Sequence, residues 1–178
     1  MDATKLQDIF DRLDASLEQR TELLIRGGAA VLAHGLEQRV TIDIDVLPGS
    51  TFIDRDLRSA CTRIGLGFNP ADKDVMERDY LEVVPEETLI LPKPSADRPY
   101  NTVYRGQRLT VKTPPAADLI VGKLKRLEAE DLADVAFLVE RFRLQRFDLE
   151  EAFARLDARA SADPVVADNL RYVIEDYL

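Results

Sequence analysis

The pattern of apolar and polar residues predicts strands and helices in the first two thirds of the chain and helices alone afterwards. Residues 3–19 place apolar side chains at helical spacing, with charges between them. Residues 22–25 form a short apolar run that indicates a buried strand, and residues 29–36 indicate a short helix. Residues 39–47 alternate apolar and polar side chains, as a half-buried strand does.

The remaining pattern is weaker in the middle and clearly helical at the end. Residues 54–65 favour a helix, whereas glycines and prolines divide residues 66–112 into short pieces. Within that stretch we expect strands at 89–91 and at 103–111, the latter folded back at Arg105-Gly106-Gln107, and either a helix or a strand at 74–83. Further helices are predicted at 116–127, at 130–143, after a cap at Asp148 and after a cap at Asp163.

These elements predict an α/β (α+β) fold in which helices flank a mixed β-sheet and a helical tail follows. We expect residues 1–112 to form the core and residues 113–178 to form a helical C-terminal subdomain packed on it. A length of 178 residues suits one domain with a small helical addition.

Composition and charge narrow the functional classes. Hydrophobic residues make up 46% and charged residues 32% of the chain, as in ordinary globular proteins. The net charge of −9 argues against broad DNA binding, although a local basic patch is compatible with it. The single cysteine, Cys61, offers no internal disulfide, and neither a transmembrane-length apolar run nor a signal-peptide pattern is present. We therefore expect a cytoplasmic protein without membrane contact.

Two carboxylates, Asp43 and Asp45, lie in the strand predicted at 39–47. Residues two apart on a strand point to the same face, and the apolar residues between 40 and 46 would fix that register. Neighbouring carboxylates repel unless a cation lies between them, and Mg²⁺ often takes one or two carboxylates together with substrate phosphates. The pattern therefore indicates either a magnesium site or the solvated face of a half-exposed strand.

The dipeptide Gly27-Gly28 separates the first predicted strand from the short helix. Glycines allow the backbone to approach a phosphate closely, and a helix N-terminus offers free N–H groups. The same pair could instead form only a tight turn. A phosphate cradle followed by an Asp-x-Asp strand supplies two neighbouring features that phosphoryl transfer needs.

Together these residues resemble the signature of the nucleotidyltransferase superfamily. The signature is an apolar residue, Gly, and Gly or Ser, followed by a strand with Asp-x-Asp/Glu; here the chain has Ile25-Arg26-Gly27-Gly28 and then Asp43-Ile44-Asp45. The resemblance is to the minimal DNA-polymerase-beta-like branch, which includes toxin–antitoxin nucleotidyltransferases. Residues 119–126 and 130–135 are similar to the Lys-x-x-Arg and Asp-x-x-Asp helices of these relatives.

The resemblance implies a nucleotidyltransferase-like sheet and a defined site. Asp43 and Asp45 would bind Mg²⁺, Gly27 and Gly28 would hold the β- and γ-phosphates of an NTP, and Lys123 would contact phosphate or the acceptor. An acceptor hydroxyl would attack the α-phosphate, and pyrophosphate would leave. The toxin–antitoxin relatives imply an RNA or a protein acceptor and a cognate toxin or antitoxin partner, and the acidic net charge favours the protein acceptor.

Two features depart from the family pattern. Many active relatives carry Ser where this chain has Gly28, so a hydroxyl contact to phosphate is missing. Active relatives also carry a third carboxylate on a later strand, but the strands expected at 89–91 and 109–111 hold no acid. The nearest candidates for that third carboxylate are Asp79 and Glu82.

Several other polar residues have a structural interpretation beside the functional one. Lys123 could extend along an otherwise apolar helix, and Asp131 and Asp134 could pair with Lys123 or Arg126 and fix the packing of two helices. We prefer that pairing to a catalytic role for these two acids.

Four side chains near the predicted site also need an interpretation. Arg39 and Thr41 share the predicted face of the two acids, and Arg39 could balance their charge or contact the nucleotide phosphate. The lone histidine, His34, is expected to be structural rather than a general base. Cys61 lies on the apolar side of its helix and is expected to be inert.

Three functional hypotheses follow from the sequence. The first is a magnesium-dependent nucleotidyltransferase that moves a nucleotide from an NTP to RNA or protein, either within a toxin–antitoxin system or outside one. The second is a catalytically inactive binding module of the same fold, such as a nucleotide sensor or an antitoxin partner. The third is a plain α/β domain in which both motifs are accidental.

Overall fold

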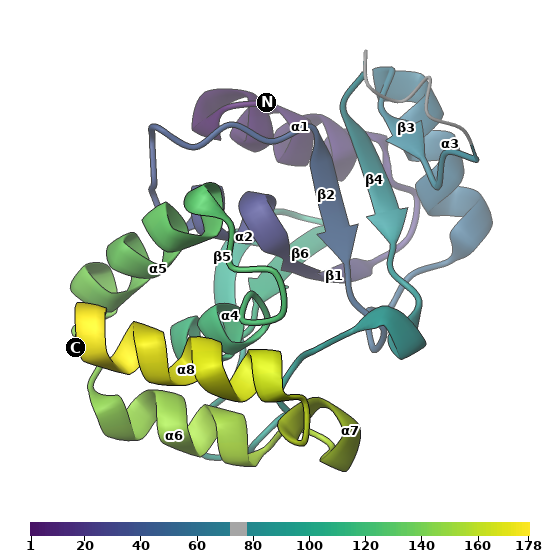
Figure 1. The fold of residues 1–178 in the computed structure, drawn as a ribbon. Coiled ribbons are helices and arrows are strands. Elements are labelled where there is room, and N and C mark those ends of the chain that lie inside the picture. The colour runs from purple at the N-terminus through teal and green to yellow at the C-terminus, as the bar shows by residue number, and fades with distance from the viewer. Residues whose placement is uncertain (72–77) are drawn as a thin grey trace. The chain divides into compact units, whose positions relative to one another are not determined.

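The computed structural model describes residues 1–71 and 78–178. The chain forms two compact units (Figure 1). The first contains residues 1–87 and 100–113, and the second contains residues 88–99 and 114–178. The prediction that residues 113–178 pack on a core of residues 1–112 stays a prediction.

The first unit is built around a mixed β-sheet. Its six strands in the described residues follow the order β3-β4-β2-β1-β6-β5. β1 runs antiparallel to β2 and parallel to β6, β4 runs parallel to β2 and β3, and β5 runs antiparallel to β6. The strands are β1 Thr21–Arg26, β2 Asp43–Val46, β3 Gly67–Phe68, β4 Tyr80–Val83, β5 Asn101–Arg105 and β6 Leu109–Thr113.

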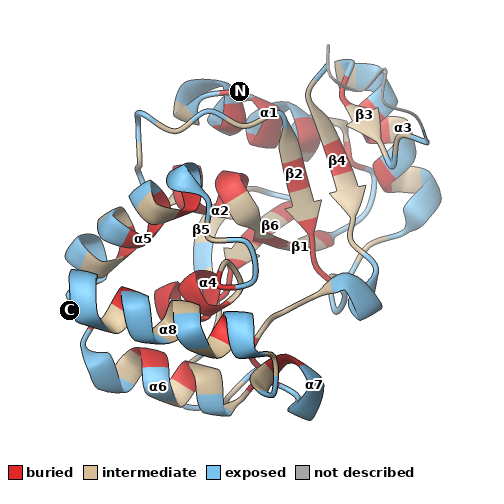
Figure 2. Ribbon diagram, viewed as in Figure 1, coloured by how far each residue is buried: buried red, intermediate tan, exposed pale blue. Residues whose placement is uncertain are grey.

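Three helices complete the first unit: α1 Ala3–Ser16, α2 Gly27–Ala33 and α3 Asp54–Ile64. The side chain of Asp2 accepts a hydrogen bond from the Lys5 backbone and caps α1, whereas Gly65 ends α3 in the left-handed conformation. α1 contacts both α2 and α3. The buried core of this unit includes Leu6, Ile9, Phe10, Leu13, Leu23, Ile25, Ile44, Val46, Leu81, Leu109 and Val111 (Figure 2).

The second unit is helical. Its helices are α4 Ala116–Val121, α5 Ala129–Phe142, α6 Arg146–Ala154, α7 Ala158–Ser161 and α8 Pro164–Tyr177, and the short 3-10 helix η2 Glu86–Thr88 lies where the chain passes between the units. Asp163 caps α8 directly before Pro164, which suits a first helical turn. The buried side chains include Leu119, Ile120, Leu124, Val135, Leu138, Leu149, Val166 and Val173.

The predicted fold class is confirmed, and so are most of the predicted elements. The strand at 22–25, the hairpin folded at Arg105-Gly106-Gln107 and the helices at 54–65 and 130–143 are present. The helix predicted at 3–19 ends at Ser16. The helix predicted to begin with a cap at Asp148 starts earlier, because Gln145 and Asp148 together form the capping box of α6.

Three predicted elements are wrong in extent or type. The strand expected at 39–47 begins only at Asp43, which pairs with Tyr80, the first residue of β4. Val40 and Ile42, which are 61% and 37% exposed, lie before this pairing. Residues 89–91 are not a strand and follow η2 instead. The helix expected at 116–127 ends at Val121 and continues as turns.

The segment at 74–83 was compatible with a helix or a strand. Residues 80–83 form β4, whereas residues 74–77 lie outside the described residues. In the part of the chain that the structure describes, none of the helices is both long enough and apolar enough to cross a bilayer.

Candidate active site

The glycine turn lies directly against the strand that carries the two acids. The antiparallel pairing of β1 with β2 places Arg26 opposite Asp45. Gly27 follows with φ +67°, a conformation that side-chain-bearing residues rarely adopt. A Cβ atom at Gly27 would lie 3.0 Å from Oδ2 of Asp45. The carboxylate of Asp45 therefore faces the turn, and both the backbone and this contact favour glycine.

Gly28 is equally crowded, by a different set of side chains. A Cβ atom there would lie 3.1 Å from both Cβ and Oγ1 of Thr41 and 3.2 Å from Nη2 of Arg39. The serine that many relatives carry at this position would force these neighbours to move. The absence of a hydroxyl at Gly28 thus goes together with the close approach of Thr41 and Arg39.

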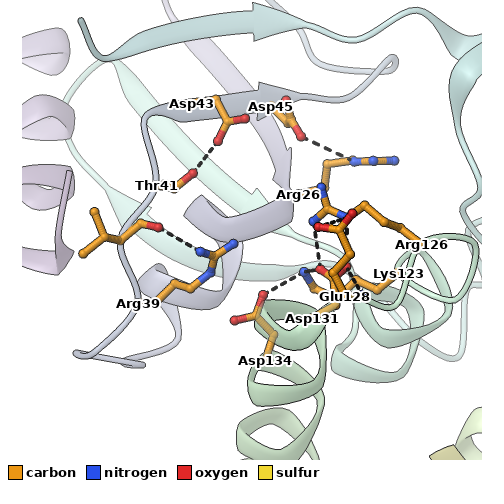
Figure 3. Close-up of polar contacts among 11 residues, drawn as sticks. Arg26, Arg39, Thr41, Asp43, Asp45, Lys123, Arg126, Glu128, Asp131 and Asp134 are labelled. Atoms are coloured by element: carbon orange, nitrogen blue, oxygen red, sulfur yellow. Dashed lines mark hydrogen bonds and ion pairs between the residues drawn. The ribbon is translucent and has the colours of Figure 1, made fainter. Parts of the chain in front are cut away.

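The carboxylates of Asp43 and Asp45 are half-buried and held by neighbouring side chains (Figure 3). The hydroxyl of Thr41 donates a hydrogen bond to Oδ1 of Asp43. Nε of Arg26 lies 3.7 Å from Oδ2 of Asp45, and the side chain of Asp45 is 22% exposed. Ile44 and Val46, on the opposite side of the strand, are fully buried, so the alternation predicted for this strand holds within β2.

A third carboxylate, Glu82, lies beside the pair. β2 and β4 are parallel neighbours, and their register places Tyr80 beside Asp43 and Glu82 beside Asp45. Neighbouring residues in adjacent strands share a face of the sheet. The pKa of Tyr80 is raised by burial and by the negative charges of Asp43, Glu82 and Asp45, which is consistent with all three acids lying on one side.

From the sequence, Glu82 was only one of the two nearest acids, because the pattern at 74–83 suited either a helix or a strand. The alternation of Leu81 and Val83 with Tyr80 and Glu82 was the available signal for a strand. Asp79, the other candidate, lies one residue before β4, and Lys5 forms an ion pair with it.

The residues fit magnesium through the two aspartates rather than through a closed set of three ligands. Among the described residues, no group of three or more His, Cys, Asp and Glu side chains could hold a metal ion. Mg²⁺ keeps several waters and is often bound by one or two carboxylates together with substrate phosphates. A pair such as Asp43 and Asp45, next to a turn where a phosphate could approach, meets that requirement.

Arg39 reaches the glycine turn from the segment before β2. Its Nη1 donates a hydrogen bond to the carbonyl of Val40 at 2.8 Å, and its Nη2 is the atom close to Gly28. From the sequence, Arg39 was expected to share a strand face with the acids. The structure places Arg39 before β2, with its guanidinium group beside Gly28.

Lys123 lies in the second unit, in the turn that follows α4, and not on a helix. Its Nζ is 3.0 Å from Oδ1 of Asp131 and 2.7 Å from Oδ2 of Asp134. Nε of Arg126 is 2.9 Å from Oδ2 of Asp131. The prediction that these acids pair with Lys123 or Arg126 is confirmed, whereas a nucleotide contact from Lys123 stays a prediction.

This cluster is almost completely excluded from water. The side chains of Asp131, Asp134 and Lys123 are 1%, 0% and 9% exposed. Burial alone would raise the pKa of Asp131, but hydrogen bonds from Arg126 and Lys123 outweigh it and lower the pKa to about 2. Asp131 also accepts a hydrogen bond from the Glu128 backbone at 3.2 Å and so helps to cap α5.

Two further residues fit the structural interpretation given to them. Nε2 of His34 lies 2.8 Å from Oγ1 of Thr113, within hydrogen-bond distance. Cys61 is fully buried, and burial raises the pKa of its thiol to about 12, so the thiol is not a nucleophile at neutral pH.

Comparison with known proteins agrees with the arrangement of acids and glycines. A family model described as "Nucleotidyltransferase of unknown function (DUF6036)" matches residues 4–165. Neither the curated proteins nor the solved structures gave a match. The family match does not specify the toxin–antitoxin branch, which stays a prediction. Because the match spans most of the 178 residues, the chain belongs to this family of nucleotidyltransferases.

Proposed function

We propose that this protein is a magnesium-dependent nucleotidyltransferase that moves a nucleotide from an NTP to an RNA or protein acceptor. The observation that carries the proposal is the contact between the Asp45 carboxylate and the glycine turn at Gly27. A triphosphate lying along that turn would have its charged oxygens beside the two aspartates. This adjacency is what a phosphoryl-transfer site requires.

Each residue at the turn has a distinct task in this proposal. Gly27 and Gly28 let the backbone approach the β- and γ-phosphates, and the guanidinium of Arg39 contacts the phosphate oxygens. Asp43 and Asp45 hold Mg²⁺, which when bound neutralises phosphate charge and polarises the α-phosphate. Arg26, now 3.7 Å from Asp45, keeps that carboxylate turned toward the glycine bend.

Glu82 serves as the general base. The acceptor hydroxyl oxygen forms a bond to the α-phosphorus while the bond from that phosphorus to the pyrophosphate oxygen breaks. The hydroxyl proton passes to the carboxylate of Glu82, and pyrophosphate leaves with the electron pair of the broken bond. The position of Glu82 beside Asp45 in the sheet supports this role.

Label transfer tests the proposal. The protein is incubated with Mg²⁺, α-labelled NTPs and separate RNA and protein acceptor pools, and the label that becomes acid-insoluble is measured. Asp43→Asn and Asp45→Asn should each lower transfer by roughly a hundredfold or more, because each removes a magnesium ligand. Asp54→Asn is the matched control, since Asp54 is 63% exposed on α3 and outside the site.

The label recovered in the RNA pool or in the protein pool identifies the acceptor class. A toxin–antitoxin role would appear as transfer that a co-expressed partner protein suppresses. Transfer that is equal in wild type, Asp43→Asn and Asp45→Asn would refute the assigned site.

The second candidate is an inactive binding module. Two contacts favour it: the crowding at Gly28 leaves no room for the hydroxyl found in many relatives, and Arg26 lies near Asp45. For such a module, we expect NTP to raise the melting temperature only with Mg²⁺ and only while Asp43 and Asp45 are intact. Label transfer would then be absent from every acceptor pool.

A further inference from the structure

A second charged feature of the first unit is a groove lined by arginines. Two adjoining hollows, of about 580 and about 510 Å³, share Arg20, Gln107 and Arg108. The first extends to Ile53 and the second to Arg105. We call the surface around Arg20, Arg105 and Arg108 the arginine groove.

Strand pairing brings these three arginines together from distant parts of the sequence. Thr21 pairs with Leu109 at the start of β1 and β6, and the Thr21 N–H donates to the carbonyl of Arg108 at 2.7 Å. Arg20 and Arg108 therefore precede paired residues on neighbouring strands. Arg105 comes from the other arm of the β5–β6 hairpin, where it pairs with Thr110.

Asp14 fixes the hairpin turn that carries Arg108. Oδ1 of Asp14 accepts the backbone N–H groups of Arg108 and Leu109 at 2.8 and 2.6 Å, and Oδ2 accepts that of Gln107 at 3.0 Å. A Cβ atom at Gly106 would lie only 2.3 Å from Cγ and Oδ1 of Asp14. Only glycine fits there, so the turn packs directly on the carboxylate.

The backbone segment that precedes Arg20 is held in the same way. The carboxylate of Asp56 accepts the backbone N–H groups of Glu18 at 3.2 Å and Gln19 at 3.0 Å, immediately before Arg20. The carboxylates of Asp14 and Asp56 thus accept hydrogen bonds from the backbone. The hairpin turn and the segment before Arg20 are both ordered before any ligand binds, which lowers the entropic cost of binding.

The guanidinium groups themselves are left available. Within residues 1–71 and 78–178, none of the three arginines of the groove forms an ion pair with a carboxylate, although the protein carries a net charge of −9. Two acids also line the hollows, and each has a cation outside the groove. Nζ of Lys112 lies 2.6 Å from Oε2 of Glu22, and Nη1 of Arg63 lies 3.8 Å from Oε1 of Glu18. The charge of Arg108 also acts on Asp14, where it helps to lower the pKa of that carboxyl. In an acidic protein, three arginines without an ion-pair partner at one place form a local anion-binding surface.

The shape and lining of the groove indicate the class of anion. Arg20 and Arg108 line both hollows and Arg105 lines the second, so the cationic lining continues from one hollow into the other. Among the side chains that line them, Ile53 is the only large apolar one, and no aromatic ring is present to stack a base. A mononucleotide would find little to hold its base, whereas a polyanion with regularly spaced charges matches the groove.

We propose that the arginine groove binds the phosphodiester backbone of a single-stranded polynucleotide. The site is separate from the proposed transfer site. Arg20 precedes the first residue of β1 and Gly27 follows its last, so the two lie about 23 Å apart along the strand at 3.3 Å per residue. The groove is a local basic patch of the kind that is compatible with the net charge of −9. It reads charge and spacing and not base identity.

Fluorescence anisotropy with labelled single-stranded oligonucleotides tests the groove. The measurement uses the full chain with EDTA and without NTP, so its outcome does not depend on nucleotide transfer at Asp43 and Asp45. With three phosphate contacts, binding to wild type should weaken about 20-fold between about 50 and 200 mM salt. The triple variant Arg20→Gln/Arg105→Gln/Arg108→Gln should lose at least tenfold in affinity and most of this salt dependence.

The matched control removes the same charge elsewhere. Lys93→Gln/Arg159→Gln/Arg171→Gln changes three exposed cations of the second unit and should bind within about twofold of wild type. Equal weakening in both triple variants would show a non-specific charge effect and overturn the proposal. Circular dichroism melts of both variants confirm that each is folded.

Binding measurements with other ligands, made in parallel, distinguish the possible classes of ligand. RNA and DNA oligonucleotides of one sequence should bind within a few fold of each other if the backbone alone is recognised, and a preference for RNA would assign the 2′-hydroxyl a contact in the groove. Competition by inorganic tripolyphosphate as strong, per molecule, as that of the oligonucleotide would instead make the ligand a small phosphate compound. Binding of polyglutamate but not of either oligonucleotide would make it an acidic protein, and both of these results would overturn the proposal.

Discussion

The protein contains two pairs of closely spaced aspartates whose surroundings are opposite. Asp131 and Asp134, three residues apart on α5, are buried and lie within 3.0 Å of the ammonium group of Lys123. Asp43 and Asp45, two residues apart on β2, are half-buried, and Nε of Arg26 lies 3.7 Å from Oδ2 of Asp45. In the helical unit the protein supplies the counter-charge, whereas on the sheet the acids face a glycine turn.

This difference is compatible with a structural role for Asp131 and Asp134 and with the functional role proposed for Asp43 and Asp45. Two buried carboxylates without a cation would be too costly to fold, so the Lys123 contacts are part of the stability of the helical unit. Half-exposed carboxylates need less compensation because water solvates them, which is compatible with the proposal that Asp43 and Asp45 hold an external cation. The short spacing of two acids in the sequence therefore does not by itself indicate their role. The cations around them must also be known.

Removal of the Lys123 charge should have the largest effect on stability. Lys123→Met leaves the carboxylates of Asp131 and Asp134 buried without the cation that both contact. We expect the free energy of unfolding to fall by about 3–5 kcal/mol, measured by urea denaturation. The control is Lys125→Met, because Lys125 is 54% exposed and its ion pair with Asp163 should contribute less than about 1 kcal/mol.

A different result would reverse the comparison. If Lys123→Met kept the stability of wild type but lost NTP binding, Lys123 would be a nucleotide ligand. The buried pair would then belong to the functional site as well.

The pH dependence of stability should reveal the second largest effect. The pKa of Asp131 is about 2 in the folded protein, below its ordinary value of 3.8, so the folded state binds the proton less readily than the unfolded state. Its contribution of about 2 kcal/mol is present above pH 4 and is lost as the pH falls toward 2. Asp131→Asn should reduce the stability difference between pH 5 and pH 2 by about that amount in urea titrations.

An exposed carboxylate provides the control for this titration. Asp168 is 68% exposed and pairs only with Arg171 on the same helix face, so Asp168→Asn should follow the wild-type pH curve. An Asp131→Asn curve that coincides with wild type would mean that the buried cluster does not control acid stability.

The sequence predicted the acid strand and the glycine turn because both depend on local patterns. Ile44 and Val46 alternate with the two acids, and glycines mark the end of β1. The extent of the acid strand was wrong, since Val40 continues the alternation but lies before Asp43, the first residue that pairs with β4. Strand length depends on where the partner strand ends, which is a property of the sheet and not of the segment.

Long-range neighbours were the part that the sequence could not supply. Glu82 and Asp45 are beside each other only because β4 pairs with β2, and a register cannot be read from either segment alone. The arginine groove has the same origin, since Arg20 and Arg108 are far apart in the chain and meet through β1 and β6. The Lys123 pairing was predictable because its partners lie 8 and 11 residues further along the chain.

A pair of glycine substitutions should give the smallest effect on stability and the sharpest one on function. Gly27 and Gly65 have similar backbone angles, φ +67° and +76°, but a Cβ atom would lie 3.0 Å from Asp45 at Gly27 and would meet nothing within 4 Å at Gly65. Gly27→Ala and Gly65→Ala should therefore each lower the free energy of unfolding by about 1–2 kcal/mol, through backbone strain. Only Gly27→Ala displaces the Asp45 carboxylate, so only this variant should lose magnesium-dependent NTP binding, measured by calorimetry. Equal NTP binding by the two variants would show that the contact between the turn and the acid strand has no role in holding the nucleotide.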